Sequence, residues 1–257
     1  MKARCSPNHD ARPPGAEIDT LVLHYTGMPT AEAALARLSD PEARVSAHYL
    51  VDDDGAIWQL VAEGRRAWHA GASFWRGQTD INARSIGIEI VNPGHEWGYR
   101  PFPAAQIEAL LTLCRAVLAR HPIAPRNVVA HSDIAPERKQ DPGELFAFAW
   151  LARNGIGLFP EAVHDLGTGD AFFSARALRA VRADLISVGY KLAPEGPLDR
   201  SLAVVLSAFQ RHWRPEAITG AADRGTRARL AALTRLLAAP VASAGCRCAD
   251  TTAGHPR

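Results

Sequence analysis

The chain has 257 residues, 47% of them hydrophobic and 22% charged, which is an ordinary composition for a globular protein with room for two domains. A net charge of +2 makes no case for nucleic-acid binding, and no apolar run has the length of a signal peptide or a membrane span. The four cysteines indicate no disulfide framework. We therefore expect a monomer without a transmembrane segment that works in the cytoplasm, with the periplasm or cell envelope as the alternative.

Residues 15–160 mix strand and helix patterns along the chain. Apolar runs predict strands at 18–25, 47–51, 56–60, 86–91 and 127–130. Apolar residues at helical spacing predict helices at 30–38, 103–120 and 143–153. Such a mixture implies an α/β fold in which a mixed central β-sheet is flanked by helices. The polar residues 1–14 are expected to form a flexible tail.

Beyond a glycine-containing linker at 161–170, the pattern becomes helical only. Apolar spacing predicts helices at 171–188, 198–212 and 226–238. We expect a small separate three-helix domain at 171–240, followed by a flexible tail at 241–257.

Two histidines and an aspartate stand where strands of the first domain end. His24 closes the strand at 18–25, and His131 follows the strand at 127–130 with Asp141 in the same loop. Two histidines and one carboxylate from separate elements form a zinc site with an open fourth position, as hydrolytic zinc sites have. A single histidine is more often structural, so the residue types alone leave a zinc site and a chance grouping as equal alternatives.

Two further charged residues stand out in this region. Glu89 lies in an apolar strand. An ionised carboxylate there has a partner such as Arg84, is exposed to solvent at an edge strand, or serves as a general base with a raised pKa. Lys139 is one of only three lysines in an arginine-rich chain, which indicates a need for a compact ammonium beside the metal loop. His48 is expected to be a hydrogen-bonded residue of the sheet rather than a ligand.

With these residues assembled, the sequence resembles the zinc-dependent N-acetylmuramoyl-L-alanine amidases that share a fold with bacteriophage-type lysozymes and peptidoglycan recognition proteins. The resemblance covers about residues 15–155. The resemblance rests on several short sequence motifs in the right order: 22–26, 46–49, 67–71 with Ser73 and Trp75, 86–89, and the loop 131–143.

The resemblance implies a role for each of these residues. One zinc ion per chain would be held by His24, His131 and Asp141. Glu89 matches the catalytic acid/base, and Lys139 matches the cation that stabilises the transition state. The substrate cleft would contain Tyr25, His69, Trp75 and Asn92. For Trp75 a place in the hydrophobic core is the alternative.

The region 175–238 resembles, more loosely, a three-helix peptidoglycan-binding domain, through residues 185, 189–190, 196–199, 208–210 and 226–230. The alternative is a plain helical bundle that stabilises the catalytic domain. The implied activity is hydrolysis of the amide between N-acetylmuramic acid and L-alanine in peptidoglycan or anhydro-muropeptides. A protein that recognises peptidoglycan without cutting it is the competing interpretation, and the complete ligand set argues against it.

Overall fold

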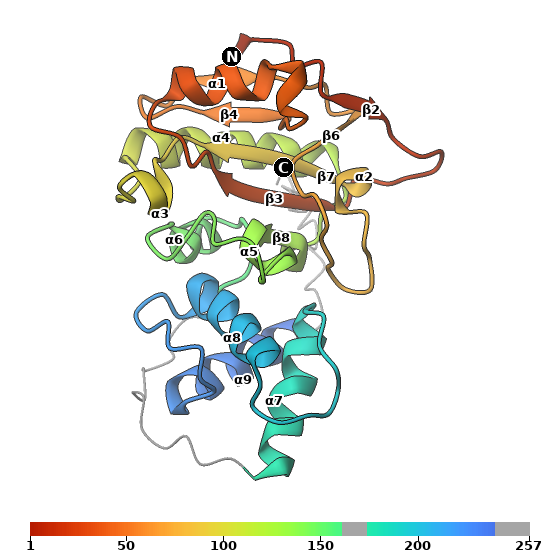
Figure 1. The fold of residues 1–257 in the computed structure, drawn as a ribbon, viewed down its shortest axis with the longest axis vertical. Helices are drawn as coiled ribbons and strands as arrows, with labels where there is room; N and C mark the ends of the chain where they lie inside the picture. The colour runs from red at the N-terminus through yellow and green to blue at the C-terminus, as the bar shows by residue number, and fades with distance from the viewer. Residues whose placement is uncertain (161–173, 240–257) are drawn as a thin grey trace, which may run out of the picture.

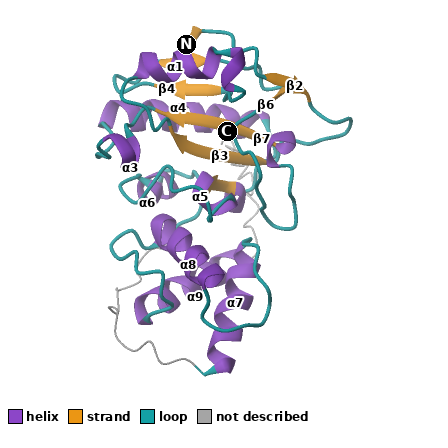
Figure 2. Cartoon of the chain, in the orientation of Figure 1, coloured by secondary structure: helices purple, strands orange, loops and turns teal. Residues whose placement is uncertain are grey.

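The computed structural model describes residues 1–160 and 174–239, and the predicted linker and C-terminal tail lie outside these ranges. Figures 1 and 2 show an α/β unit built on a β-sheet, with a helical unit beneath it. The mixed sheet flanked by helices confirms the predicted fold class. None of the described helices combines the length and the hydropathy needed to cross a membrane.

Within the described residues the main sheet has six strands, and the third and fourth in spatial order are parallel. In spatial order they are β1 (Lys2–Ala3), β5 (Ile57–Gln59), β4 (Tyr49–Val51), β7 (Ser85–Ile90), β3 (Thr20–Tyr25) and β8 (Val128–Ala130). The four strands β4, β7, β3 and β8 run parallel, and β5 is antiparallel to β4 across the turn at 52–56. Because parallel strands end at one edge, β3, β7 and β8 deliver the residues that follow them to the same place.

The helices of the α/β unit cover both faces of this sheet. They are α1 (Ala31–Ser39), α2 (Ile81–Arg84), α3 (Gly94–Trp97), α4 (Ala104–Arg120), α5 (His131–Ile134) and α6 (Phe148–Arg153), with 3₁₀ turns at Pro41–Ala43 and Pro125–Asn127. Leu21 and Leu23 of β3 pack with α4, whereas Val22 faces the opposite side. Side chains two positions apart share a face of a strand, so His24 lies on the Val22 side.

The helix predicted at 143–153 begins later, at Phe148. Gly143 has a φ of +86°, and a Cβ at this position would lie 2.3 Å from the Tyr99 hydroxyl oxygen. Residues 143–147 therefore form turns, because the glycine is fixed in a conformation that a helix does not use.

The prediction of a flexible tail at 1–14 was wrong. Residues 2–3 form the edge strand β1 beside β5, and β2 (His9–Ala11) pairs antiparallel with β6 (Arg65–Ala67). The Asn8 side chain is buried and donates to the carbonyls of Asp40 and Val45. These short polar strands are held by backbone pairing and side-chain hydrogen bonds, which leave no apolar periodicity in the sequence.

The three predicted C-terminal helices are confirmed as α7 (Ala175–Val188), α8 (Arg200–Trp213) and α9 (Arg224–Ala238). Each starts at a capping side chain, Ser174, Asp199 or Asp223, that accepts a backbone N–H three residues later. These caps explain the shifts of two to four residues from the predicted starts.

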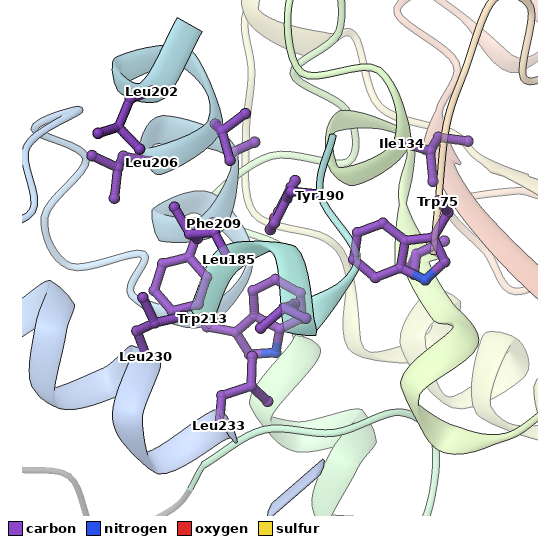
Figure 3. Close-up of a cluster of buried hydrophobic side chains, with 14 of the residues drawn as sticks. Trp75, Ile134, Leu185, Tyr190, Leu202, Leu206, Phe209, Trp213, Leu230 and Leu233 are labelled. Atoms are coloured by element: carbon purple, nitrogen blue, oxygen red, sulfur yellow. The ribbon is translucent and has the colours of Figure 1, made fainter. Parts of the chain in front are cut away.

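The helical unit, expected as a separate domain, shares one continuous apolar cluster with the sheet unit. Figure 3 shows Trp75 and Ile134 of the sheet unit beside Tyr190, with residues of the three helices beyond. The helical residues labelled there are Leu185, Leu202, Leu206, Phe209, Trp213, Leu230 and Leu233. The apolar spacing of a helix indicates which residues are buried but not which residues they pack against. The sequence pattern therefore does not predict this shared core.

Candidate metal centre

Three side chains converge at the edge where β3 and β8 end. His24 Nδ1 lies 2.9 Å from His131 Nδ1 and 3.1 Å from Asp141 Oδ2, and these last two atoms are 3.0 Å apart. All three residues are buried and form a group that could hold a metal ion. In a tetrahedral site with bonds of about 2.0–2.1 Å, ligand atoms lie about 3.3 Å apart. The triangle is therefore close to the size that a metal ion requires.

The fold supplies these side chains from two places. His24 lies near the end of β3, whereas His131 comes directly after the neighbouring edge strand β8 and opens α5. The backbone N–H of Ser132 donates to the carbonyl of Asp141 over 3.0 Å, so the two ligand-bearing positions of the second segment are tied together.

A hydrogen-bond chain fixes the tautomer of His24. The Ser85 hydroxyl donates to the Ile81 carbonyl, so its oxygen accepts from His69 Nε2–H over 3.1 Å. Neutral His69 then accepts at Nδ1 from His24 Nε2–H over 3.0 Å, which leaves the lone pair of His24 Nδ1 for the metal. A Cβ on Gly87 would lie 2.4 Å from the His69 ring, so only glycine leaves room for this ring.

His131 is oriented by a backbone carbonyl instead. Its Nε2–H donates to the Ala70 carbonyl over 3.2 Å, and the Arg138 guanidinium donates to the same oxygen over 2.7 Å. The lone pair of His131 Nδ1 is therefore also turned toward the centre. Two bare imidazole nitrogens and a carboxylate oxygen then face one another without a proton among them, which is the donor set of a divalent metal site.

The protonation states suit metal binding at neutral pH. Burial, together with the neighbouring His131, lowers the pKa of His24 to about 4. Burial alone would raise the pKa of Asp141, but the adjacent His131 and His24 rings hold it well below its usual value. The ligand histidine is therefore neutral and the aspartate ionised, as metal coordination requires.

Glu89 is a partly buried residue beside this centre, and its Oε2 atom is buried. It pairs in register with His24 across β3 and β7, and its Oε2 has no hydrogen-bond partner among the described residues. Burial and the nearby Asp141 raise the pKa of Glu89 well above its ordinary value. Arg84, the structural partner considered from the sequence, pairs with Asp19 instead. The geometry thus leaves Glu89 free to exchange a proton.

A cleft of about 320 Å³ opens in front of the metal centre. Its charged and aromatic walls include Tyr25, Arg37, Trp68, His69, Glu89 and Lys139. Within residues 1–160 and 174–239, no hydrogen bond or ion pair engages the Lys139 ammonium, so it is available to a bound molecule. The cleft thus offers a proton-exchanging carboxyl and a free cation beside the triangle of ligands.

Two of the four predicted substrate residues, Tyr25 and His69, line this cleft. Tyr25 is half-buried, and its hydroxyl lies 3.0 Å from His95 Nδ1. His69 is only 8% exposed and uses both ring nitrogens for the bonds to His24 and Ser85. The structure therefore gives His69 an orienting place behind a ligand rather than an open place in the cleft.

Trp75 and Asn92 were wrongly placed in the cleft by the sequence prediction. Trp75 is 2% exposed and packs edge-on against Tyr190 of the helical unit. It therefore belongs to the hydrophobic core, which was the alternative considered from the sequence. The Asn92 amide is wholly buried, donating to the Arg100 carbonyl and accepting from Gly94 N–H. Both residues stand near cleft segments in the sequence, but neither lines the cleft.

His48 is a hydrogen-bonded residue of the sheet, as predicted. Its Nδ1 accepts the backbone N–H of Gly87 over 2.9 Å, so its Nε2–H donates to the Arg65 carbonyl. Burial lowers its pKa to about 3.

The sequence interpretation missed two residues at this site. Arg37 lines the cleft from α1, and its guanidinium makes no hydrogen bond or ion pair to the described residues. Its only signal in the sequence was a cation beside the apolar residues Ala34 and Leu38 of an amphipathic helix. Ser85, which holds His69, had no signal, because a serine at a strand start is common.

Sequence comparison places this chain among known proteins. The profile of a family described as N-acetylmuramoyl-L-alanine amidase matches residues 14–144. The chain is 42% identical to the N-acetylmuramoyl-L-alanine amidase AmiD of Escherichia coli over 225 residues, which cover 82% of this chain and 80% of that protein. It is 36% identical to the 1,6-anhydro-N-acetylmuramyl-L-alanine amidase AmpD of Escherichia coli over 161 residues, 56% of this chain and 86% of that one.

Solved structures agree with these matches. The complex of AmiD from Escherichia coli with anhydro-N-acetylmuramic acid-L-Ala-D-γ-Glu-L-Lys is similar with a TM-score of 0.74 at 40% identity, covering 87% of this chain and 92% of that one. AmpDh3 from Pseudomonas aeruginosa with anhydromuramic pentapeptide gives a TM-score of 0.75 at 35% identity, with coverage of 87% and 94%. At this coverage, both likenesses extend beyond the sheet unit into the helices.

Proposed function

The chain belongs to the N-acetylmuramoyl-L-alanine amidase family, and we propose that it is a zinc hydrolase that cleaves the amide between N-acetylmuramic acid and L-alanine of the stem peptide. The observation that carries this proposal is the convergence of His24 Nδ1, His131 Nδ1 and Asp141 Oδ2 beside the unpaired carboxyl of Glu89. A site that only recognised peptidoglycan would have no use for a buried carboxyl with a raised pKa.

The three ligands fit zinc by their chemistry. Two neutral imidazoles and one carboxylate are a common ligand set of hydrolytic zinc, and their bare donor atoms lie at nearly the required spacing. Zinc bound there supplies Lewis acidity, which acidifies water and polarises a carbonyl. The ligands' part is to keep their lone pairs turned inward, through the hydrogen bonds from His24 to His69 and from His131 to Ala70.

Glu89 acts as the general base and then as the general acid. Its carboxyl accepts a proton from the attacking water and passes one to the leaving amine of L-alanine. The burial that raises its pKa brings the carboxyl closer to the pH at which both transfers work. Because Oε2 has no partner among the described residues, no hydrogen bond must break first.

Lys139 stabilises the negative charge that develops on the scissile carbonyl oxygen. Its ammonium lines the cleft without an internal partner, so no ion pair competes with the substrate. Loss of one such donor typically costs about 3 kcal/mol of transition-state stabilisation. Tyr25 forms part of the cleft wall that contacts the substrate.

The substrate that fits best is a soluble anhydro-muropeptide, with intact peptidoglycan as the second candidate. Two of the similar solved structures hold anhydro-muropeptides in complexes. For α7–α9 the proposal remains a peptidoglycan-binding three-helix domain, which would favour the intact polymer. Digestion of sacculi and of soluble anhydro-muropeptide, side by side, decides between the two substrates. Cell fractionation tests the predicted cytoplasmic location against the cell envelope.

The test of the activity is release of the peptide from anhydro-N-acetylmuramic acid-L-Ala-D-γ-Glu-L-Lys, followed by mass spectrometry. We expect one zinc per chain and turnover that disappears on chelation. The isosteric Glu89→Gln variant should bind zinc normally and lose roughly 10²–10⁴-fold in turnover. Lys139→Met, which keeps the length without the charge, should lose on the order of 10²-fold or more. Muropeptide binding without any turnover by the wild type would support a recognition protein instead.

A further inference from the structure

Asp133 lies between His131 and Asp141 in the sequence and has no role in the proposed mechanism. It is 1% exposed, and its carboxylate is surrounded by three donors. The Ala130 backbone N–H and His212 Nδ1–H donate to Oδ2 over 2.8 and 2.7 Å, and the Tyr190 hydroxyl donates to Oδ1 over 2.7 Å. A buried carboxylate with three donors is tightly fixed, because each charge-assisted bond is short and strong.

Two of these donors come from the helical unit. Tyr190 follows α7, and His212 lies in the last turn of α8, 57 and 79 residues away from Asp133 in the sequence. Packing fixes both rings in place. His212 stacks between Phe148 and Trp213, at centroid distances of 3.7 Å each, and Tyr190 packs edge-on against Trp75. Figure 3 shows Tyr190 at this boundary between the units.

Asp133 in turn fixes the segment that carries the ligands. Its bond to the Ala130 N–H pins the residue directly before His131. The Ala135 N–H donates to the His131 carbonyl, and the Ser132 N–H donates to the Asp141 carbonyl, each over 3.0 Å. A displacement of Asp133 would thus move the backbone at both ligand positions.

We infer that Tyr190 and His212 are positioning residues of the metal centre, through which the C-terminal helices hold His131 and Asp141 in the geometry that binds zinc. The inference rests on the proposed zinc role of these ligands. It gives the helical unit a task beyond binding the cell wall, because the metal centre of the sheet unit depends on contacts that only the helices supply.

A purely stabilising role for the helices makes a different prediction. If Tyr190 and His212 contributed only to folding, their loss would lower the melting temperature and leave the zinc affinity of the folded protein unchanged. The matched control is Leu233→Ala, because Leu233 belongs to the same apolar cluster and makes no hydrogen bond to Asp133. This variant opens a cavity in the helical core without touching the metal segment.

The experiment compares full-length wild type with Tyr190→Phe, His212→Phe and Leu233→Ala. Both phenylalanines keep an aromatic ring and remove the donor to Asp133; Tyr190→Phe removes nothing but the hydroxyl, whereas His212→Phe also enlarges the ring. Zinc dissociation constants are measured by competition with a chromophoric chelator, well below the melting temperature of each apoprotein. Cobalt-substituted samples give visible spectra that report the coordination geometry independently of activity.

We expect both phenylalanine variants to bind zinc about tenfold more weakly, the lower end of the range for residues that support metal ligands. Their cobalt spectra should also shift, whereas Leu233→Ala keeps wild-type values despite a lower melting temperature. Unchanged affinity and spectrum in folded Tyr190→Phe overturn the inference, as does an equal loss in Leu233→Ala. If His212→Phe does not fold, Tyr190→Phe alone decides, since it differs by one oxygen. Failure of the wild type to bind zinc would instead overturn the proposed function.

Discussion

The two histidines of the proposed metal centre are supported in different ways. His24 is held from within the sheet unit, by a chain of neutral side chains that runs through His69 to Ser85. The segment of His131 is held by a buried carboxylate, Asp133, that binds donors from the C-terminal helices. One support is therefore complete within residues 1–160, whereas part of the other comes from the C-terminal helices.

The two supports depend on different features of the structure. The support of His24 depends on a tautomer, because His69 must accept rather than donate, and on the space that Gly87 leaves. The support of His131 depends on distance, because Asp133 must stay within reach of groups on α8 and after α7. Variants that affect one support and spare the other can test whether the two are independent.

The largest effect is expected from Asp133→Ala, which removes the helix-side support outright. Three buried donors would lose their acceptor, and each unsatisfied group costs about 1–3 kcal/mol, so we expect a loss of at least about 3 kcal/mol in unfolding free energy. Urea unfolding of the apoprotein measures it. A loss below about 1 kcal/mol, the cost of removing an ordinary helix cap, would contradict the role of Asp133 as a link between the units.

Within the sheet unit, Gly87→Ala should disturb the hydrogen bond between His69 and His24, because its methyl group collides with the His69 ring. The new Cβ would lie 2.4 Å from the His69 ring, so the ring must shift, at a cost of about 1–3 kcal/mol in stability. Zinc affinity should fall with it. Gly64→Ala is the control, because nothing lies within 4 Å of a Cβ there. Equal behaviour of the two variants in thermal melts and zinc titrations would show that His69 is not confined as described.

The tautomer argument is sharpened by two substitutions at His69. His69→Leu removes the acceptor for His24 Nε2–H, and we expect zinc binding to weaken roughly 10–100-fold. His69→Asn can place an amide oxygen near the former Nδ1 and should retain more of the affinity. Chelator competition at constant pH provides the comparison. If leucine and asparagine behave alike, the hydrogen bond does not set the tautomer of His24.

The smallest expected effect is a loss of folding stability in acid, caused by the buried neutral histidines of the sheet unit. The pKa of His48 is lowered to about 3, so the unfolded chain takes up a proton near pH 6.5 that the folded chain refuses. Stability therefore falls as the pH drops below 6.5 and stops falling near pH 3. From pH 6.5 to 5.5 this one group should contribute about 1 kcal/mol. Unfolding free energies of the wild-type and His48→Asn apoproteins at both pH values isolate this contribution. If stability falls equally with pH in the two proteins, His48 is not the group responsible.

Much of the site could be predicted from local patterns. The strand ends at His24 and His131 and the apolar setting of Glu89 all follow from a few neighbouring residues. Such features reflect intrinsic preferences of short segments, so a single sequence contains them. The family resemblance then assigned roles to Glu89 and Lys139 that residue types alone left open.

Long-range packing decided the rest. Local patterns could not tell that Trp75 turns into the core beside Tyr190 or that Asn92 binds the backbone near Arg100. Nor could they reveal that residues 2–3 join the main sheet.

The sequence by itself determined most of the longer strands and helices and the chemistry that the strand ends carry, because periodicity and capping act over a few residues. The tertiary structure alone decided that Asp133 meets Tyr190 and His212, and so that the helices contact the segment of the proposed metal centre. The reason is physical: a hydrogen bond between residues 79 positions apart depends on how two packed surfaces fit, and no local preference encodes that fit.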